Sequence, residues 1–136
     1  MIGEGTTRKT FAVRNDQKLV VKEAKPRAIG ANWTEYLVWN AGRVTRWAPV
    51  LGAVHSISEG GQYLVMERLS DLTEEDRFRA PDIPYWLNDL KKENFGKAVD
   101  GSNLIKARDY AVVNLAFELD ESVPYTAAWK RVRVLK

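Results

Sequence analysis

Alternating apolar and polar residues divide the first half of the chain into two hairpins with a helix between them. Each hairpin has two strand-like runs around a turn of polar residues or glycines. The predicted strands are residues 11–14 and 18–22 in the first hairpin, and residues 51–58 and 62–67 in the second. We therefore expect the order strand, strand, helix, strand, strand.

The predicted helix has a candidate start and a candidate end. Asn32 is a residue type that caps helices, and Glu35 three residues later completes a capping box. Apolar side chains recur at helical spacing from Trp33 to Trp39, and Gly42 is the expected stop.

The second half is less regular. We expect a short helix at 70–79, an ordered loop with a brief helix at 82–97, short strands at 103–106 and 110–113, and one or two strands in the C-terminal residues. The predicted fold class is α+β, with an antiparallel sheet and one main helix.

Composition narrows the class of protein. With 136 residues, of which 45% are hydrophobic and 29% charged, the chain fits a single globular domain over residues 1–136. Cysteine is absent, which excludes disulfides, thiolate metal sites and a cysteine nucleophile. There is neither an apolar run of membrane-spanning length nor a signal-like start, so we expect a cytoplasmic protein with no membrane contact. The only histidine, His55, is expected to be a half-buried structural residue.

The net charge of +3 owes much to the basic segment 130–136. Val132 and Val134 alternate there with Arg131 and Arg133, which is typical of a strand with one solvated face. The same charges suit a phosphate backbone, but one short segment is a small electrostatic footprint. We favour the strand and consider nucleic-acid binding unlikely.

Candidate phosphate-binding residues lie in the first quarter of the chain. Gly3 and Gly5 precede a strand, where glycines let a turn approach phosphates closely, although a plain hairpin turn explains them equally. Lys22 ends an apolar strand and either reaches solvent or serves a site. Glu35, in the following helix, is either a capping residue or the ion-pair partner of Lys22, and we favour the ion pair.

Two further motifs in the second half of the chain contain acidic and amide side chains. Asp89 and Asn94 are separated by four residues that include Lys91. Asp109 follows a short predicted strand, and an aromatic residue comes after it. A helix start is the alternative explanation of the first motif.

Taken together and in this order, the motifs resemble those of the protein-kinase-like superfamily over about residues 2–113. The resemblance implies a truncated kinase-like fold. Residues 1–69 would form the small lobe and hinge, and residues 70–136 a reduced catalytic and metal-loop region with C-terminal strands.

The resemblance further implies that the chain binds ATP and Mg²⁺. The loop with Gly3 and Gly5 would cover the phosphates, and Lys22 would contact the α- and β-phosphates. The Glu67 carbonyl and the Leu69 amide would meet the adenine edge.

The same resemblance implies the roles of the remaining site residues. Glu35 would orient the lysine, Asp89 would be the catalytic base, and Lys91 would approach the γ-phosphate. Asn94 and Asp109 would ligate magnesium, which prefers few protein ligands together with phosphate and water.

The chain also departs from the family pattern. Arg8 stands in place of the third glycine, where an arginine can itself touch a phosphate, and Tyr110-Ala111 follow Asp109 in place of phenylalanine and glycine. The large-lobe helices are not recognisable in 114–136. Apolar surface that they cover in kinases would be exposed, so we expect a homodimer or a protein partner.

Two functions follow from this pattern. The first is a phosphotransferase that moves the γ-phosphate of ATP to a hydroxyl of a protein or small molecule. The alternative is a catalytically inactive, kinase-like interaction or regulatory protein (a pseudokinase) that acts through its surface.

Overall fold

A computed structural model describes residues 1–79, 81–84, 86–87, 90–111 and 122–124. Within these residues the fold is α+β, with one α-helix and mostly antiparallel strands, in agreement with the predicted class. None of the helices in this part of the chain has the length and apolar character needed to cross a bilayer.

The largest sheet has five antiparallel strands in the order β1-β2-β3-β5-β4. Its strands are β1 (Gly3–Glu4), β2 (Arg8–Val13), β3 (Asp16–Ala24), β4 (Val54–Ile57) and β5 (Tyr63–Glu67). Both predicted hairpins are confirmed as β2–β3 and β4–β5, although β4 begins later than predicted. The central strand β3 places Lys22 opposite Thr10 on one side and Leu64 on the other.

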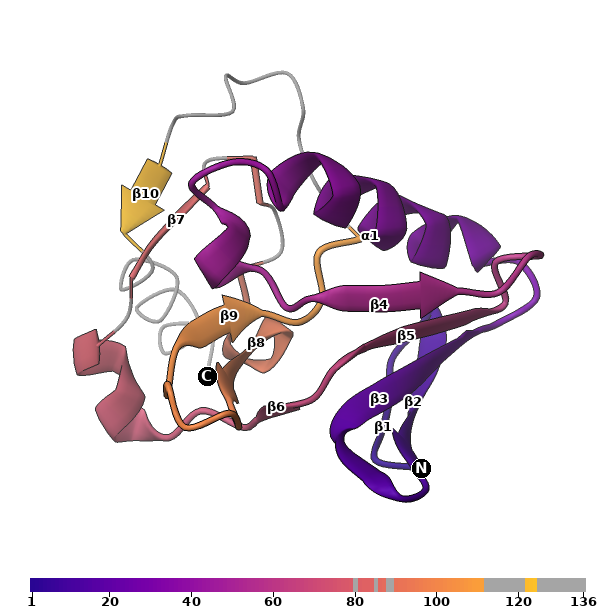
Figure 1. Cartoon of the computed structure of the whole chain (residues 1–136), viewed down its shortest axis with the longest axis horizontal. Helices are drawn as coiled ribbons and strands as arrows, with labels where there is room; N and C mark the ends of the chain where they lie inside the picture. The colour runs from indigo at the N-terminus through magenta and orange to yellow at the C-terminus, as the bar shows by residue number, and fades with distance from the viewer. Residues whose placement is uncertain (80, 85, 88–89, 112–121, 125–136) are drawn as a thin grey trace.

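Helix α1 (Ile29–Gly42) lies against one face of this sheet, along β4 in Figure 1. Its predicted end at Gly42 is confirmed, but its predicted start is wrong. The N-cap is Ala28, no side chain caps the helix, and Asn32 lies one turn inside it. The amide of Asn32 instead donates to the backbone oxygens of Lys22 on β3 and of Gly61 and Gln62 in the turn before β5, which ties the helix to the sheet.

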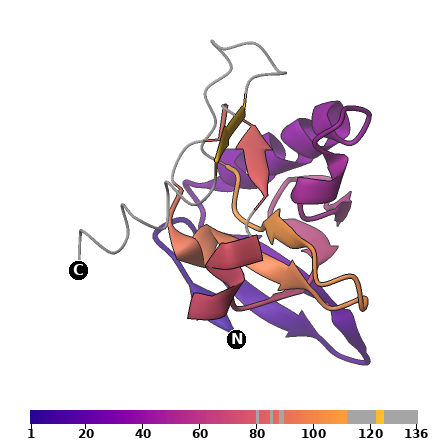
Figure 2. The same cartoon turned by 90° about the vertical axis from the view of Figure 1, so that its left-hand side faces the viewer.

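Among the described residues, the other regular elements are two small sheets and three short 3₁₀ helices. One sheet has the order β6-β8-β9, with β6 (Leu69–Ser70), β8 (Phe95–Ala98) and β9 (Ile105–Ala107); the other pairs β7 (Asp82–Pro84) with β10 (Ser122–Pro124). The 3₁₀ helices are η1 (Ala48–Val50), η2 (Glu74–Arg79) and η3 (Lys92–Asn94). Figure 2 views the molecule from the side on which η2 and the small sheets lie.

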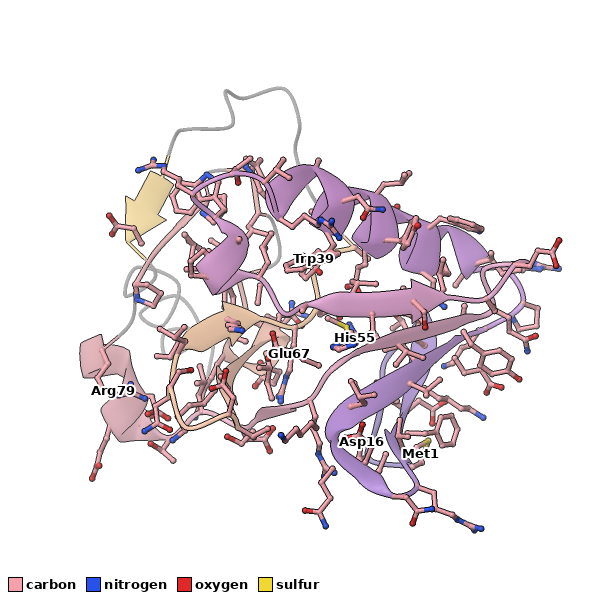
Figure 3. The ribbon with its side chains drawn as sticks, in the orientation of Figure 1. Met1, Asp16, Trp39, His55, Glu67 and Arg79 are labelled. Carbon is pink, nitrogen blue, oxygen red and sulfur yellow. The ribbon has the colours of Figure 1, made fainter. Side chains whose placement is uncertain are left out.

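The second half matches the sequence predictions only in part. The helix expected at 70–79 is confined to η2, and the brief helix expected in 82–97 is η3, but strands β7 and β8 were not predicted. Tyr110 and Ala111 are not in a strand, because both polar ends of Tyr110 bond to other parts of the fold. His55 is exposed on β4 rather than half-buried (Figure 3). The basic segment 130–136 lies outside the described residues.

A polar joint connects the five-stranded sheet to the three-stranded sheet. Glu67 lies at the end of β5, where the chain crosses between the sheets (Figure 3), and its carboxylate accepts from Lys106 Nζ and Ala53 N at 2.8 Å each. The Gly52 amide donates to the Ala107 carbonyl at 2.7 Å. One cluster of buried apolar residues runs through both sheets, from Val20 and Leu64 to Phe95 and Ile105.

Candidate functional site

A cleft of about 1250 Å³ lies between the five-stranded sheet and the three-stranded sheet. The β1–β2 turn, the cleft-facing side of β3, the crossing from β5 to β6, and the residues around η3 and after β9 line it. The lining includes most of the residues to which the sequence assigned a role, namely Gly3, Gly5, Lys22, Glu67, Leu69, Lys91, Asn94 and Asp109.

The ion pair expected between Lys22 and Glu35 forms at the inner wall of the cleft. Lys22 Nζ lies 2.8 Å from Glu35 Oε1, and both side chains are buried. Strand β3 brings the lysine to this point and helix α1 brings the glutamate. Lys22 Nζ also donates to the carbonyl oxygen of Arg108. Burial lowers the pKa of Lys22, and the neighbouring Glu35 opposes that shift.

Glu35 accepts four hydrogen bonds within the site. Its Oε1 accepts from Lys22 and from Arg8 Nη1, and its Oε2 accepts from Arg8 Nη2 and, at 2.7 Å, from the Tyr110 backbone amide. Burial alone would raise the pKa of Glu35, but Lys22 and Arg8 outweigh it and lower the pKa to about 2. The carboxylate therefore stays charged, and capping plays no part in its position.

Arg8 has contacts that the sequence analysis did not predict. An arginine in place of the third glycine could touch a ligand phosphate, but the side chain of Arg8 is buried and contacts protein oxygens. Arg8 Nη1 donates to Glu35 and Asn32, and Nη2 donates to Glu35 at 2.8 Å and to Asp109 Oδ1 at 2.9 Å. The sequence offered one signal for this position. Residues two apart on a strand share a face, so Arg8 lies on the same face of β2 as Thr10, which is opposite Lys22.

Backbone hydrogen bonds hold Asp109 and Asn94 close together. The Asn94 carbonyl accepts from the Arg108 amide at 2.8 Å and from the Asp109 amide at 3.3 Å. The Asp109 side chain is 46% exposed, in contrast to the buried Asn94. Partial removal from water raises the pKa of Asp109, while Lys22 and Arg8 act in the opposite direction.

The donor set of Asn94 and Asp109 suits a magnesium ion. Carboxylate and amide oxygens are the ligands that Mg²⁺ takes, usually one or two from the protein with phosphate and water completing the shell. No group of three or more His, Cys, Asp or Glu side chains that could hold a metal ion occurs in the described part of the chain.

The remaining candidates are distributed around the cleft. Asp89 lies outside the described residues, whereas Lys91 lines the cleft. Glu67 and Leu69 line it at the crossing between the sheets, where the Glu67 carboxylate is turned into the joint with Lys106. A side chain added at Gly3 or Gly5 would meet nothing within 4 Å, so the β1–β2 turn leaves open space beside these glycines.

The cleft also has apolar walls that sequence reasoning did not identify as a group. Ile2 from the start of the chain is 49% exposed, and Val99 from the end of β8 is 46% exposed. Val20 and Met66 line the same cleft and are buried. The cleft therefore has apolar as well as polar lining, a mixture that is common in small-molecule sites.

Comparison with known proteins adds no relative to this description. No protein-family model, no curated protein and no solved structure matches the chain.

Proposed function

We propose that this chain is a kinase-like protein that binds ATP with magnesium and transfers the γ-phosphate to a hydroxyl group of a protein or small molecule. The observation that carries the proposal is the convergence of two unlike parts on one cleft. The buried Lys22–Glu35 pair comes from β3 and α1, Asn94 and Asp109 come from the segments around η3 and after β9, and Arg8 joins Glu35 to Asp109.

The chemistry of each group supports a separate part in this reaction. Lys22, held by Glu35, would bind the α- and β-phosphates, and Asn94 and Asp109 would hold magnesium, which neutralises charge on the phosphates. The acceptor oxygen would bond to the γ-phosphorus, the bond from that phosphorus to the β–γ bridging oxygen would break, and the hydroxyl proton would pass to Asp89. Lys91 would approach the γ-phosphate.

The apolar residues of the cleft would hold the adenine ring of the nucleotide. Ile2 and Val20 would contact one face of a purine and Val99 the other, with Met66 behind it. The backbone at Glu67 and Leu69 follows the same wall and would meet the polar edge of the ring.

A second candidate is a catalytically inactive, kinase-like interaction protein. The contact between Arg8 Nη2 and Asp109 Oδ1 favours it, because this contact occupies one oxygen of the proposed metal ligand. The phosphotransferase and the inactive form share the cleft and differ in whether bound nucleotide is turned over.

Thermal melting with and without ATP and Mg²⁺ tests the proposal. We expect the melting temperature of the wild type to rise by several degrees, and only when ATP and Mg²⁺ are both present. At a nucleotide concentration one hundred times the Kd, binding stabilises the folded state by about 2.7 kcal/mol. Asp109→Ala should abolish this gain, because the metal ligand is lost while the half-exposed position tolerates alanine. Asp100→Ala, at an exposed position outside the cleft, is the matched control and should retain it.

A transfer assay with labelled γ-phosphate then separates the two candidates. Label on a hydroxyl acceptor that is lost in Asp109→Ala supports the phosphotransferase, and nucleotide binding without turnover supports the inactive protein. No shift with ATP and Mg²⁺ in a folded wild type would contradict nucleotide binding altogether.

A further inference from the structure

Four charged side chains at the inner wall of the cleft have formal charges that sum to zero. Arg8 and Lys22 are the cations, and Glu35 and Asp109 are the anions. Three of the four are buried, with at most 8% of their side chains exposed, whereas Asp109 is 46% exposed. Arg8, Lys22 and Asp109 all line the cleft, and Asp109 is the anion among them, so an incoming cation would meet the cluster at Asp109.

Arg8 is the group that neutralises Asp109. Each terminal nitrogen of a guanidinium carries two hydrogens. Nη1 directs its pair to Asn32 and Glu35, and Nη2 directs its pair to Glu35 and Asp109, so these donors are fully used by the protein. An arginine can bridge the Glu35 and Asp109 carboxylates better than a lysine, because its planar guanidinium donates from several nitrogens in fixed directions.

This charge balance has a consequence for a divalent cation. An Mg²⁺ ion at Asp109 would add two positive charges beside two buried cations, and repulsion at this range is strong where water is largely excluded. The phosphates of a nucleotide bring negative charge of their own and remove that obstacle. A metal ion alone has no such compensation.

We propose that Arg8 is a resident counter-cation that makes metal binding at Asp109 conditional on nucleotide. The inference rests on the proposed function only for the identity of the ligand, because the competition between Arg8 and a cation for Asp109 is a property of the cluster itself. Arg8 is a positioning residue here, and a merely structural bridge would leave the affinity for metal unchanged.

Binding of Mn²⁺ in the absence of nucleotide, measured by titration calorimetry, tests the proposal on the full chain. We expect no measurable binding at Asp109 in the wild type and a gain of at least about tenfold in affinity in Arg8→Gln, because one positive charge beside the metal is removed. The double variant Arg8→Gln/Asp109→Asn should lose this gain. Lys9→Gln removes the same charge from the next residue of β2, which does not line the cleft, and should behave as wild type.

Two measurements keep the test decisive if Arg8→Gln does not fold. Arg8→Lys retains the charge and is expected to stay as inert to Mn²⁺ alone as the wild type. The wild type itself must bind Mn²⁺ far more weakly alone than in the presence of ATP. Tight, Asp109-dependent binding of Mn²⁺ alone to the wild type would overturn the proposal, as would a folded Arg8→Gln with no gain.

Failure of the inference is distinguishable from failure of the proposed function. If the wild type binds ATP with metal but folded Arg8→Gln gains nothing for metal alone, only the role of Arg8 is wrong. If the wild type binds no nucleotide while Arg8→Gln gains an Asp109-dependent metal site, the competition is supported and the proposed function is wrong.

Discussion

A single buried carboxylate organises the candidate site. Glu35 accepts hydrogen bonds from Arg8 on β2, from Lys22 on β3 and from the backbone of Tyr110 after β9. Since these donors come from three separate parts of the fold, Glu35 fixes their relative positions. A charged group in such a place is stable only while all of its partners remain.

Glu35→Gln is expected to lower the free energy of unfolding at neutral pH by about 3–5 kcal/mol, because two buried cations lose their carboxylate. In the wild type, the pKa of Glu35 falls from 4.5 to about 2 on folding, so the folded state binds fewer protons. The stabilisation is complete above pH 4.5 and is lost as the pH falls from there towards 2.

Urea unfolding across this pH range measures both effects. Between pH 4.5 and about 2, the free energy of unfolding of Glu35→Gln should fall less than that of the wild type, because glutamine does not titrate. Glu59→Gln, at an exposed turn position, is the matched control and should follow the wild type. Parallel curves for Glu35→Gln and the wild type would contradict the assignment.

The sequence predicted part of this cluster and missed its remaining member. The pairing of Lys22 with Glu35 was accessible, since a lysine ending a strand and a glutamate in the next helix are 13 residues apart. The contacts of Arg8 were not, because its partners Glu35 and Asp109 lie 27 and 101 residues away, and only the assembled fold brings them within reach. Burial of an arginine is also unusual without such partners.

At the scale of elements, the strong periodicity of apolar residues predicted the longer strands and the helix correctly. The preferences of single residues predicted short strands and the start of the helix poorly. The β2–β3 and β4–β5 hairpins and helix α1 follow their patterns, because each has enough residues to repeat its period. Strands such as β6 and β7 have two or three residues and form only through distant partners. Asn32 has a strong preference for helix caps, but its amide bonds to carbonyls of β3 and of the β4–β5 turn instead.

The turn between β4 and β5 requires glycine at one of its two glycine positions. Gly61 has a φ of +80°, and a Cβ there would lie 2.1 Å from Trp33 Nε1 on α1. Gly61→Ala is therefore expected to cost more than about 1 kcal/mol of stability. Gly60→Ala, which meets nothing within 4 Å, should cost far less. Equal denaturation midpoints for the two variants would show that the turn adapts.

At the scale of the whole molecule, exposed apolar residues bear on the expected homodimer. Leu37 on α1 is 62% exposed, and Val44 just beyond the helix is 79% exposed. Contact surfaces bury such side chains. We propose that a homodimer would use this end of the helix.

Light scattering tests the homodimer directly. The wild type should give twice the monomer mass of 15.5 kDa at micromolar concentration, and Leu37→Glu should give the monomer mass, because a charge cannot be buried unpaired in an apolar contact. Leu104→Glu makes the same change at a 45% exposed site in the β8–β9 turn and should leave the mass unchanged. A monomeric wild type would rule out the dimer.

The contact between Arg8 and Asp109 has a consequence for the synthesis of the protein. Because it joins positions 101 residues apart, a chain emerging from the ribosome completes β2, β3 and α1 long before Asp109 and the Tyr110 amide exist. Until then, water must solvate the groups of Arg8 and Glu35 that these late residues later satisfy. We expect that the first strands do not fold stably on the ribosome. They should fold in one step, once Asp109 and Tyr110 have left the exit tunnel and can bond to Arg8 and Glu35.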